Sequence, residues 1–411
     1  MTRIGILTTH PPGQSLGTTK RVTGLARGLR ANGVDCVLLS PYPGRPAWWD
    51  SGEFASLATS MGQQVSSTAR RIAVDAFYRW KSVRRLGLRN PSRLHTEIRS
   101  LARALAARTG ALHLDVLQAE QQVAAAAACS VKRELGMPVV ADLHNVWAAE
   151  LTEDGLAAPG SPIEREARAL DARIATEADG ILVPDREMRD YFVDELRADR
   201  ARTWVVPTGA TARVSNPSSP PPPFRLAYSG TVAPWVRLDP FLDACALLHR
   251  DGIDMVLFAT GRGPGRRRLR RQARVRGVHL EFYWFPTEAE YFRFLSTCHI
   301  GIVPWAVSAS RTYAVPGKMY DYLAAGIPVV ATGSGSWAED VAREDLGRHV
   351  REEPQEIAAA LRDLVANEAL RTRMAANGLA FLAREFSWSQ IAKVAAGAYE
   401  TVRSAPRGGA G

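Results

Sequence analysis

The residues best suited to chemistry lie between positions 315 and 331, where the sequence reads VPGKMYDYLAAGIPVVA. This pattern predicts a loop, a helix, a glycine stop and a proline-led buried strand. A helix start that carries a lysine, here Lys318, favours phosphate oxygens because its first backbone amides have no partner within the helix. The amides expected to be unpaired donors are those of Lys318, Met319 and Tyr320.

Asp321 follows these amides and is expected in the first turn of the helix. A carboxylate at this place can accept hydrogen bonds from the hydroxyl groups of a ribose. Alternatively, the carboxylate only complements the helix dipole, which favours acidic side chains near a helix start. Taken alone, Asp321 is explained by the second interpretation, so the choice depends on the rest of the chain.

The rest of the chain alternates short apolar runs with segments of helical periodicity, which is typical of βαβ units and a mainly parallel sheet. Strands are expected at 4–8, 34–39, 116–119, 138–143, 180–183 and 203–206, and again at 225–229, 255–260, 279–282, 300–304 and 328–332. Two helices, at about 354–381 and 387–404, are expected to close the chain.

A proline-rich segment separates two halves of similar size. Residues 211–223 read TARVSNPSSPPPP, and four consecutive prolines cannot join a helix or a central strand, so an extended linker is predicted. A chain of 411 residues is also expected to form two domains. We expect these at 1–210 and 224–386, followed by a terminal helix and tail at 387–411. Strands of both domains would then end at a shared cleft, where such sheets bind ligands.

Composition excludes several classes of protein. No apolar run approaches the roughly 18 residues that span a membrane, and the start, MTRIGILTTHPPG, lacks the pattern of a secretory signal. The four cysteines are scattered in apolar contexts, which is typical of reduced thiols in the cytoplasm. They are Cys36, Cys129, Cys245 and Cys298.

Two segments carry most of the positive charge of the chain, which is +10 overall. From Arg70 to Arg108 there are eleven basic residues against two acids, and residues 262–276 contain eight arginines and no acid. Such runs are either solvated helical faces or attract anionic partners such as phosphates, a membrane surface or nucleic acid. Nucleic acid is not expected, because the arginine runs lack interleaved aromatic residues on a recognisable module.

The stretch at 315–331 resembles the donor-binding motif of GT-B-fold glycosyltransferases of the group 1 (family 4) type. The family form is roughly P-x-K-[LM]-[FY]-E-Y-[LM]-A-x-G-x-P-V-[VI]-A, and this chain departs from it in carrying Asp321 where glutamate is usual. Tyr313 stands where many members have a second glutamate. The resemblance implies a GT-B fold, an α/β architecture in which two doubly wound Rossmann-like domains face each other across a cleft.

Further matches follow in order along the chain and imply the roles of individual residues. They include LAYSGT at 226–231, GRGPG at 261–265, EFYWFP at 281–286, HPPGQSLGT at 10–18 and DLHN at 142–145. The resemblance implies that the catalytic residues are His144, Arg237 and Lys318. The donor-binding residues that it implies are Gly17, Gly230, Thr231, Arg237, Gly263, Phe285, Pro316, Gly317, Lys318, Met319, Tyr320 and Asp321.

The resemblance also implies the reaction: transfer of a sugar from a nucleotide-diphosphate sugar, UDP- or GDP-linked, to an acceptor hydroxyl with retention of configuration. The sequence contains no D-x-D motif and no His/Cys/carboxylate cluster with metal-ligand spacing, so neither a metal nor another cofactor is expected. Two alternatives remain, an epimerase or hydrolase of nucleotide sugars on the same fold and an inert homologue that acts as a binding module.

The acceptor is expected to be a lipid-linked saccharide or a soluble small molecule. Within the basic segment 70–108, Phe77 and Trp80 recur at helical spacing beside arginines, a pattern of helices that lie on membrane surfaces. Peripheral contact with the inner membrane face through this segment is one interpretation. In the other, the two aromatic side chains pack into the N-terminal domain.

Overall fold

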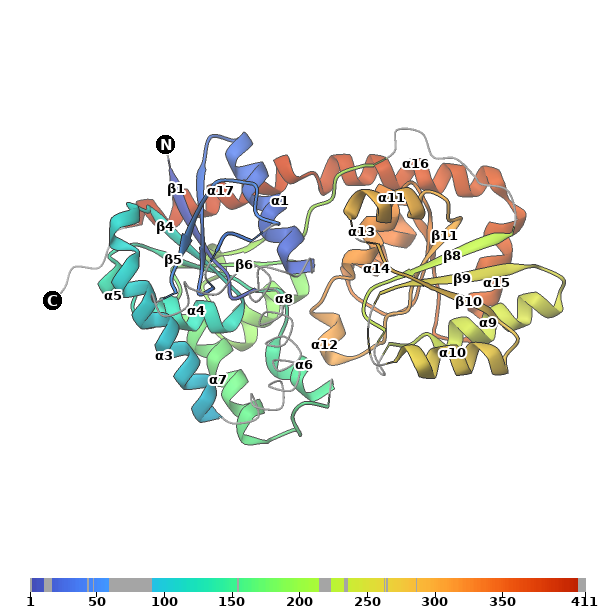
Figure 1. The fold of residues 1–411 in the computed structure, drawn as a ribbon, viewed down its shortest axis with the longest axis horizontal. Coiled ribbons are helices and arrows are strands. Elements are labelled where there is room, and N and C mark those ends of the chain that lie inside the picture. The colour runs from blue at the N-terminus through green and yellow to red at the C-terminus, as the bar shows by residue number, and fades with distance from the viewer. Residues whose placement is uncertain are drawn as a thin grey trace. The chain divides into compact units, whose positions relative to one another are not determined.

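The computed structural model describes residues 2–10, 17–42, 44–46, 48–58, 91–153, 155–213, 223–232, 236–261, 263, 265–285 and 287–405. Most of the proline-rich segment and residues 70–90 of the first basic segment lie outside these ranges, so Phe77 and Trp80 are not described. The chain divides into two compact units (Figure 1). The N-terminal unit comprises Met1–Thr208 with Trp388–Gly411, and the C-terminal unit comprises Gly209–Ser387.

The N-terminal unit is built on a seven-stranded sheet in the order β3-β2-β1-β4-β5-β6-β7, with every neighbouring pair parallel. Its central strands are short and mostly buried runs, as expected when helices cover both faces of a parallel sheet, whereas the edge strand β3 is partly exposed. The order reverses between β1 and β4, and this switch point is where doubly wound sheets bind ligands beyond their strand ends. The strands are β1 (Arg3–Leu7), β2 (Asp35–Ser40), β3 (Glu53–Ser56), β4 (Val116–Glu120), β5 (Val139–Asp142), β6 (Gly180–Val183) and β7 (Thr203–Val205).

Helices connect these strands, and the last helix of the chain returns to pack on the first. A Cβ atom at Gly24 would lie 2.1 Å from the Trp388 ring, and one at Gly28 would lie 2.4 Å from the Trp388 carbonyl oxygen. Both glycines therefore permit the close approach of α1 and α17. The helices are α1 (Gly17–Ala31), α3 (Pro91–Arg108), α4 (Gln121–Ser130), α5 (Lys132–Leu135), α6 (Trp147–Glu153), α7 (Pro162–Glu177), α8 (Arg186–Asp190) and α17 (Trp388–Ser404).

The C-terminal unit repeats the plan with a six-stranded parallel sheet in the order β10-β9-β8-β11-β12-β13, which reverses between β8 and β11. Its strands are β8 (Phe224–Ser229), β9 (Met255–Thr260), β10 (His279–Tyr283), β11 (Ile300–Val303), β12 (Val329–Ala331) and β13 (Gly347–His349). Its helices are α9 (Asp239–Arg250), α10 (Arg266–Val275), α11 (Glu288–Leu295), α12 (Ala309–Thr312), α13 (Gly317–Ala324), α14 (Ser336–Arg343), α15 (Pro354–Ala366) and α16 (Glu368–Glu385).

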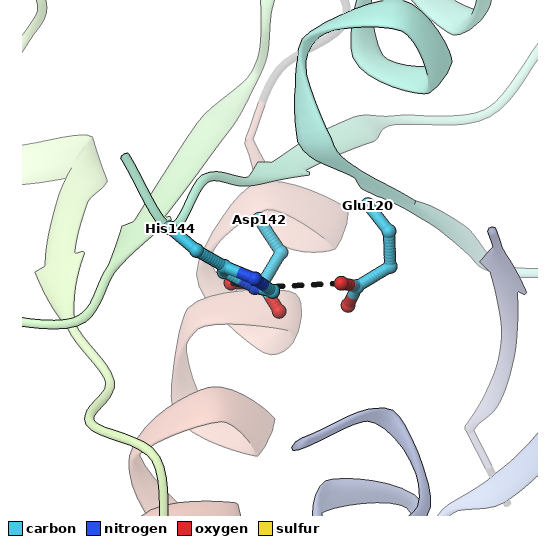
Figure 2. Close-up of side chains that lie close together, drawn as sticks. All are labelled: Glu120, Asp142 and His144. Carbon is cyan, nitrogen blue, oxygen red and sulfur yellow. Dashed lines mark ion pairs between the residues drawn. The ribbon is translucent and has the colours of Figure 1, made fainter. Parts of the chain in front are cut away.

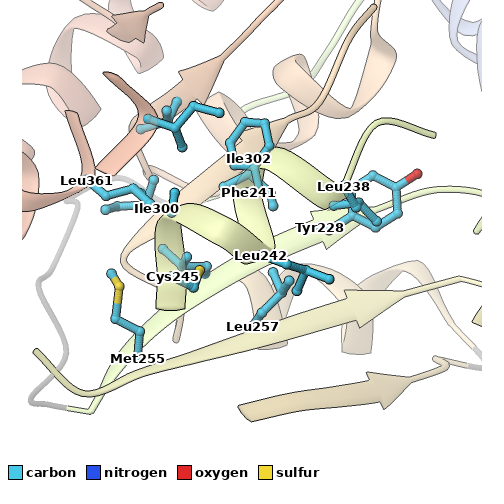
Figure 3. Close-up of a cluster of buried hydrophobic side chains, with 14 of the residues drawn as sticks. Tyr228, Leu238, Phe241, Leu242, Cys245, Met255, Leu257, Ile300, Ile302 and Leu361 are labelled. Carbon is cyan, nitrogen blue, oxygen red and sulfur yellow. The ribbon is translucent and has the colours of Figure 1, made fainter. Parts of the chain in front are cut away.

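One core of this unit lies between the sheet and helices α9 and α15 (Figure 3). Phe241 and Leu242 on α9 are fully buried there, together with Ile302 and Leu361. The helix expected at 354–381 is in fact two helices, because the side chain of Asn367 caps a new helix by accepting a hydrogen bond from the Leu370 amide at 2.9 Å. Among the described residues, no helix combines the length and the apolar character needed to cross a membrane.

Candidate functional site

In the C-terminal unit, the carboxyl end of β8 and the start of α13 meet at the switch point of the sheet. The fully buried Tyr322 joins them, since its hydroxyl oxygen accepts a hydrogen bond from the Ser229 amide at 2.7 Å and donates to the Ile302 carbonyl at 3.3 Å. A Cβ atom at Gly301 would lie 2.2 Å from the Tyr322 ring, so this glycine makes room for the tyrosine. The expected phosphate-binding helix is thereby fixed beside Gly230.

Lys318 lies on the first turn of α13 with its Nζ atom 5.3 Å from the ring centroids of both Tyr228 and Trp305. A Cβ atom at Gly230, whose φ is +125°, would lie 3.3 Å from the Lys318 Cε atom, so a side chain there would crowd the lysine. Among the described residues, no carboxylate lies within ion-pairing distance of this ammonium group. Burial first, and then the Arg311 cation, lower the pKa of Lys318 to about 8, against the opposing effect of Asp321. An anion would relieve this uncompensated charge.

Asp321 is the fifth residue of α13 and not part of its first turn, because the helix already begins at Gly317. Its carboxylate accepts a hydrogen bond from the hydroxyl of Tyr291 on α11 at 3.1 Å. The prediction that Asp321 lies in the first turn is therefore wrong. Because the helix dipole acts on charges in the first turn, it does not explain this carboxylate. Asp321 nevertheless lies on the same helix as Lys318, one turn further along.

At least one of the three backbone amides expected to be unpaired at the start of α13 has a partner. The Met319 amide donates to the Pro316 carbonyl at 2.8 Å, so it is not available to a phosphate. The Met319 and Tyr320 side chains are buried in the core of the unit, where Tyr320 packs against Phe386 with ring centroids 4.6 Å apart. Pro316 is buried and caps the helix, and Gly317 is exposed as its first residue.

The other residues expected to bind the donor have different surroundings. Arg237 is exposed and forms an ion pair with Glu352, with 2.5 Å between the Nε and Oε1 atoms. The Thr231 carbonyl accepts a hydrogen bond from Tyr228. A Cβ atom at Gly263 would lie 2.2 Å from the Val232 carbonyl oxygen, so this glycine allows two backbone segments to touch.

Phe285 lies in an aromatic cluster just beyond the end of β10. Its ring centroid is 5.0 Å from that of Phe294, 6.1 Å from that of Tyr283 and 6.1 Å from that of Tyr291. Tyr291 is also the residue that donates to Asp321, so the aromatic cluster and the helix with Lys318 are connected through one side chain. The neighbouring Trp284 is 57% exposed.

In the N-terminal unit, a buried polar cluster lies beyond the ends of β4 and β5 (Figure 2). The Nε2 atom of His144 is 3.3 Å from Asp142 Oδ1 and 3.4 Å from Glu120 Oε2. Arg21 on α1 binds the same oxygen of Asp142, with 2.7 Å between Arg21 Nη2 and Asp142 Oδ1. His144, expected to face the transferred sugar, is thus mostly enclosed by protein groups, with 15% of its side chain exposed. Gly17 begins α1, the helix that carries Arg21.

Gln121 fixes the other ring nitrogen of His144. Its backbone has φ +66°, a conformation that a residue other than glycine adopts at an energetic cost. From there its side-chain nitrogen lies 3.2 Å from His144 Nδ1. In the tautomer with the proton on Nε2, which faces the two carboxyl groups, Nδ1 is the acceptor of this contact.

Burial and neighbouring charges shift the pKa values of the titratable groups in this cluster. Burial works to raise the pKa of Asp142, but Arg21 and His144 outweigh it and hold that pKa below its usual range. Burial and the Asp142 carboxylate raise the pKa of Glu120 well above its usual range. Burial lowers the pKa of His144 by more than Asp142 raises it. These shifts favour an ionised Asp142 paired with Arg21, and they favour the uncharged forms of Glu120 and His144.

Glu120, Asp142 and His144 offer ligand atoms within 4.8 Å of one another, so their geometry would allow a metal ion. This set has no metal-ligand spacing in the sequence, because its members lie at the ends of two separate strands. Arg21, however, already binds Asp142, so a divalent ion at this place would lie against a buried guanidinium cation. We interpret the three side chains as part of a hydrogen-bonding network.

The network extends to the terminal helix. The Tyr399 hydroxyl donates to Gln118 Oε1 at 2.5 Å, and the Gln118 amide donates to Glu120 at 2.8 Å and to Asp142 at 2.9 Å. Gln118, Glu120 and Gln121 were not expected to belong to a site. A signal was present, because the strand reads VLQAEQQ and places polar residues two apart at the end of an apolar run.

Comparison with known proteins agrees with this architecture. Residues 17–213 match the family described as Glycosyltransferase Family 4, and residues 214–381 match the family described as Glycosyl transferases group 1. The chain therefore belongs to the group 1 glycosyltransferases, which confirms the resemblance found in the sequence. The fold is GT-B, with two Rossmann-like α/β domains. Sucrose-phosphate synthase from Thermosynechococcus elongatus has a similar structure, with a TM-score of 0.73 and 15% identity over 98% of this chain and 99% of that one.

Another similar structure is HepE of Anabaena in complex with UDP and glucose, with a TM-score of 0.66 and 15% identity over 98% of this chain and 100% of that one. Among curated proteins, the D-inositol 3-phosphate glycosyltransferase of a Nocardioides species is 25% identical over 76% of this chain and 73% of its own length. The GDP-mannose-dependent alpha-(1-6)-phosphatidylinositol dimannoside mannosyltransferase of Mycobacterium tuberculosis is 25% identical over 57% of this chain. That match spans 61% of the mannosyltransferase.

Proposed function

We propose that this protein transfers a sugar from a nucleotide-diphosphate sugar to an acceptor hydroxyl, without a metal ion and with retention of configuration. The observation that carries the proposal is Lys318, a half-buried residue at the switch point of the C-terminal sheet whose ammonium group has no described carboxylate partner. Such a cation is preorganised for the negative charge that develops on a leaving diphosphate. Asp321, on the same helix, is the proposed partner of the ribose hydroxyls.

The other residues have defined parts in this proposal. Arg237 is a second cation for the diphosphate. To bind the diphosphate, the Arg237 side chain leaves its ion pair with Glu352. No carboxylate is assigned as a covalent nucleophile. Retention is proposed to follow front-side substitution, in which the leaving phosphate takes the proton of the acceptor hydroxyl. His144, whose Nδ1 atom contacts Gln121, is proposed to line the transferred sugar.

The donor and acceptor classes are narrowed by similar proteins. One relative is named as GDP-mannose-dependent and a similar structure contains UDP, so we propose a GDP- or UDP-linked donor. The names of two relatives contain an inositol, one in a phospholipid and one as a soluble phosphate. We propose an acceptor of one of these two kinds, lipid-linked or soluble. We place the protein in the cytoplasm, with support from four buried, unpaired cysteines.

Product analysis tests the proposal. The protein is incubated with radiolabelled GDP-mannose or UDP-glucose, with and without candidate acceptors, and with a metal chelator in a parallel series. Transfer predicts a labelled acceptor product that forms in the presence of chelator and is absent without acceptor. Free sugar without acceptor would indicate a hydrolase, and an altered nucleotide sugar would indicate an epimerase. Failure of both donors to bind would indicate an inert module.

A further inference from the structure

The proposed reaction leaves the second basic segment without a role. Helix α10 (Arg266–Val275) carries six arginines and no acid in ten residues. Leu269 and Ala273 are its buried residues and attach it to the core of the C-terminal unit. With 100° between successive residues, four of the arginines occupy the half of the helix opposite to these two, namely Arg267, Arg268, Arg271 and Arg274. Arg266 and Arg270 lie closer to the buried side.

Only part of this charge is compensated within the unit. Arg268 forms an ion pair with Asp239 at 3.1 Å. Arg266 and Arg270 lie over the Phe282 ring, with their guanidinium carbons 4.5 and 5.3 Å from its centroid.

Three exposed arginines form a stripe on the outer side of the helix. Arg267, Arg271 and Arg274 follow the i, i+4, i+7 spacing of one helical face. Among the described residues, none offers these three guanidinium groups a carboxylate or another hydrogen-bond acceptor. The stripe is therefore a patch of uncompensated positive charge.

The arrangement is unfavourable for the isolated helix. Like charges three and four residues apart repel each other along it. Arginines also occupy its first three positions, where the helix dipole favours acidic side chains. Because no described part of the fold offsets this repulsion at the stripe, an external anion would stabilise the helix.

We propose that the stripe of Arg267, Arg271 and Arg274 is a docking surface for a membrane that contains anionic phospholipids. A helix of ten residues is about 15 Å long, so the stripe faces several headgroups of a lipid surface at once. Val275, 80% exposed beside the stripe, adds an apolar contact at the same surface. A single-stranded nucleic acid would need exposed stacking aromatics, whereas the arginines cover the Phe282 ring.

Vesicle co-sedimentation tests this surface independently of the transfer reaction. The full chain is mixed with vesicles of phosphatidylcholine containing phosphatidylglycerol, and with vesicles of phosphatidylcholine alone. We expect sedimentation with the anionic vesicles only, and release as salt is raised. The triple variant Arg267→Glu/Arg271→Glu/Arg274→Glu should lower the partition coefficient at least about tenfold, whereas a triple lysine variant should retain it.

The charge-reversed variant is expected to fold, because all three positions are exposed and the change replaces a run of like charges by mixed charges. A matched control reverses three exposed arginines on α3, Arg93, Arg99 and Arg103, and should still sediment. Three results would overturn the proposal: no binding of the wild type at low salt, equal binding of the α10 variant, or loss of binding in the α3 variant alone. Binding to a single-stranded oligonucleotide without any binding to vesicles would also overturn it.

Discussion

The side-chain nitrogen of Gln121 lies 3.2 Å from Nδ1 of His144, and it reaches that position from a left-handed backbone conformation. Strain of this kind persists where the surrounding structure enforces it, and it often occurs at functional sites. The strained residue Gln121, just after β4, thus contacts the ring of the histidine that follows β5. We infer that Gln121 positions His144.

The variant Gln121→Gly tests this relationship. Glycine adopts positive φ without strain, so the free energy of unfolding should stay level or rise by about 1 kcal/mol. His144 loses its partner, so turnover should fall by about tenfold or more while the donor dissociation constant changes little. Urea denaturation and steady-state kinetics measure the two effects. A variant with unchanged turnover would show that Gln121 has only a structural role.

Asp185 predicts a pH dependence of stability. It caps α8 by accepting a hydrogen bond from the Met188 amide at 2.7 Å, and burial raises its pKa to about 7. A carboxyl group whose pKa is raised by folding contributes its full stability below its unfolded pKa, near 3.8, and loses it as pH rises through about 7.

The variant Asp185→Ser keeps a capping oxygen and removes the buried charge. It should be close to wild type in stability at pH 4 and more stable at pH 8, by up to about 4 kcal/mol. Denaturant unfolding at both pH values measures the difference. If the gain is the same at pH 4 and pH 8, the ionisation of Asp185 is not its cause.

The contact between α1 and α17 predicts opposite effects of two glycine-to-alanine changes. In Gly28→Ala the new Cβ atom would lie 2.4 Å from the Trp388 carbonyl oxygen, so the terminal helix has to shift. We expect a loss of about 2–3 kcal/mol in the free energy of unfolding. Gly397→Ala on α17 is the matched control, because its Cβ atom meets nothing within 4 Å. It should stabilise by about 0.5–1 kcal/mol. Equal effects of the two changes in thermal unfolding would contradict the packing described for α17.

Much of the fold follows from the sequence, because buried parallel strands are continuous apolar runs bounded by turns. The position of Lys318 on a helix start follows from Pro316, Gly317 and the periodicity after them. β3 was not expected, since EFAS is a short edge strand with partly exposed residues. The start of α13 one residue earlier than expected was enough to move Asp321 out of the first turn.

The polar cluster of the N-terminal unit could not be derived in the same way. Arg21, Gln118, Asp142 and Tyr399 come from four elements and meet only after the sheet and the terminal helix have formed. Local pattern places each of them on an element but does not show which side chains meet. His144 was found because a recognisable motif contains it, whereas its partners Glu120 and Gln121 had no such motif.

The lowered pKa of Lys318 predicts how donor binding depends on pH. An anion binds the protonated ammonium, so donor affinity should be constant below about pH 8 and fall above it as the free protein loses this proton. The variant Lys318→Arg keeps its charge to much higher pH, and its residual affinity should lack the fall. Titration of the nucleoside diphosphate between pH 6.5 and 9.5 measures both curves. If the affinity falls in the same way in both proteins, the group that loses the proton is not Lys318.

The most direct test of the account is calorimetric titration of GDP and UDP, alongside guanosine and uridine, into wild type, Lys318→Ala and the surface control Lys393→Ala. Charge-assisted hydrogen bonds contribute about 1.5–3 kcal/mol each. We therefore predict that one diphosphate binds the wild type and the control equally, and Lys318→Ala about ten- to a hundredfold more weakly. The affinity of the matching nucleoside should not change. Equal binding of the diphosphate to Lys318→Ala and wild type would contradict the assignment of Lys318 as the diphosphate cation.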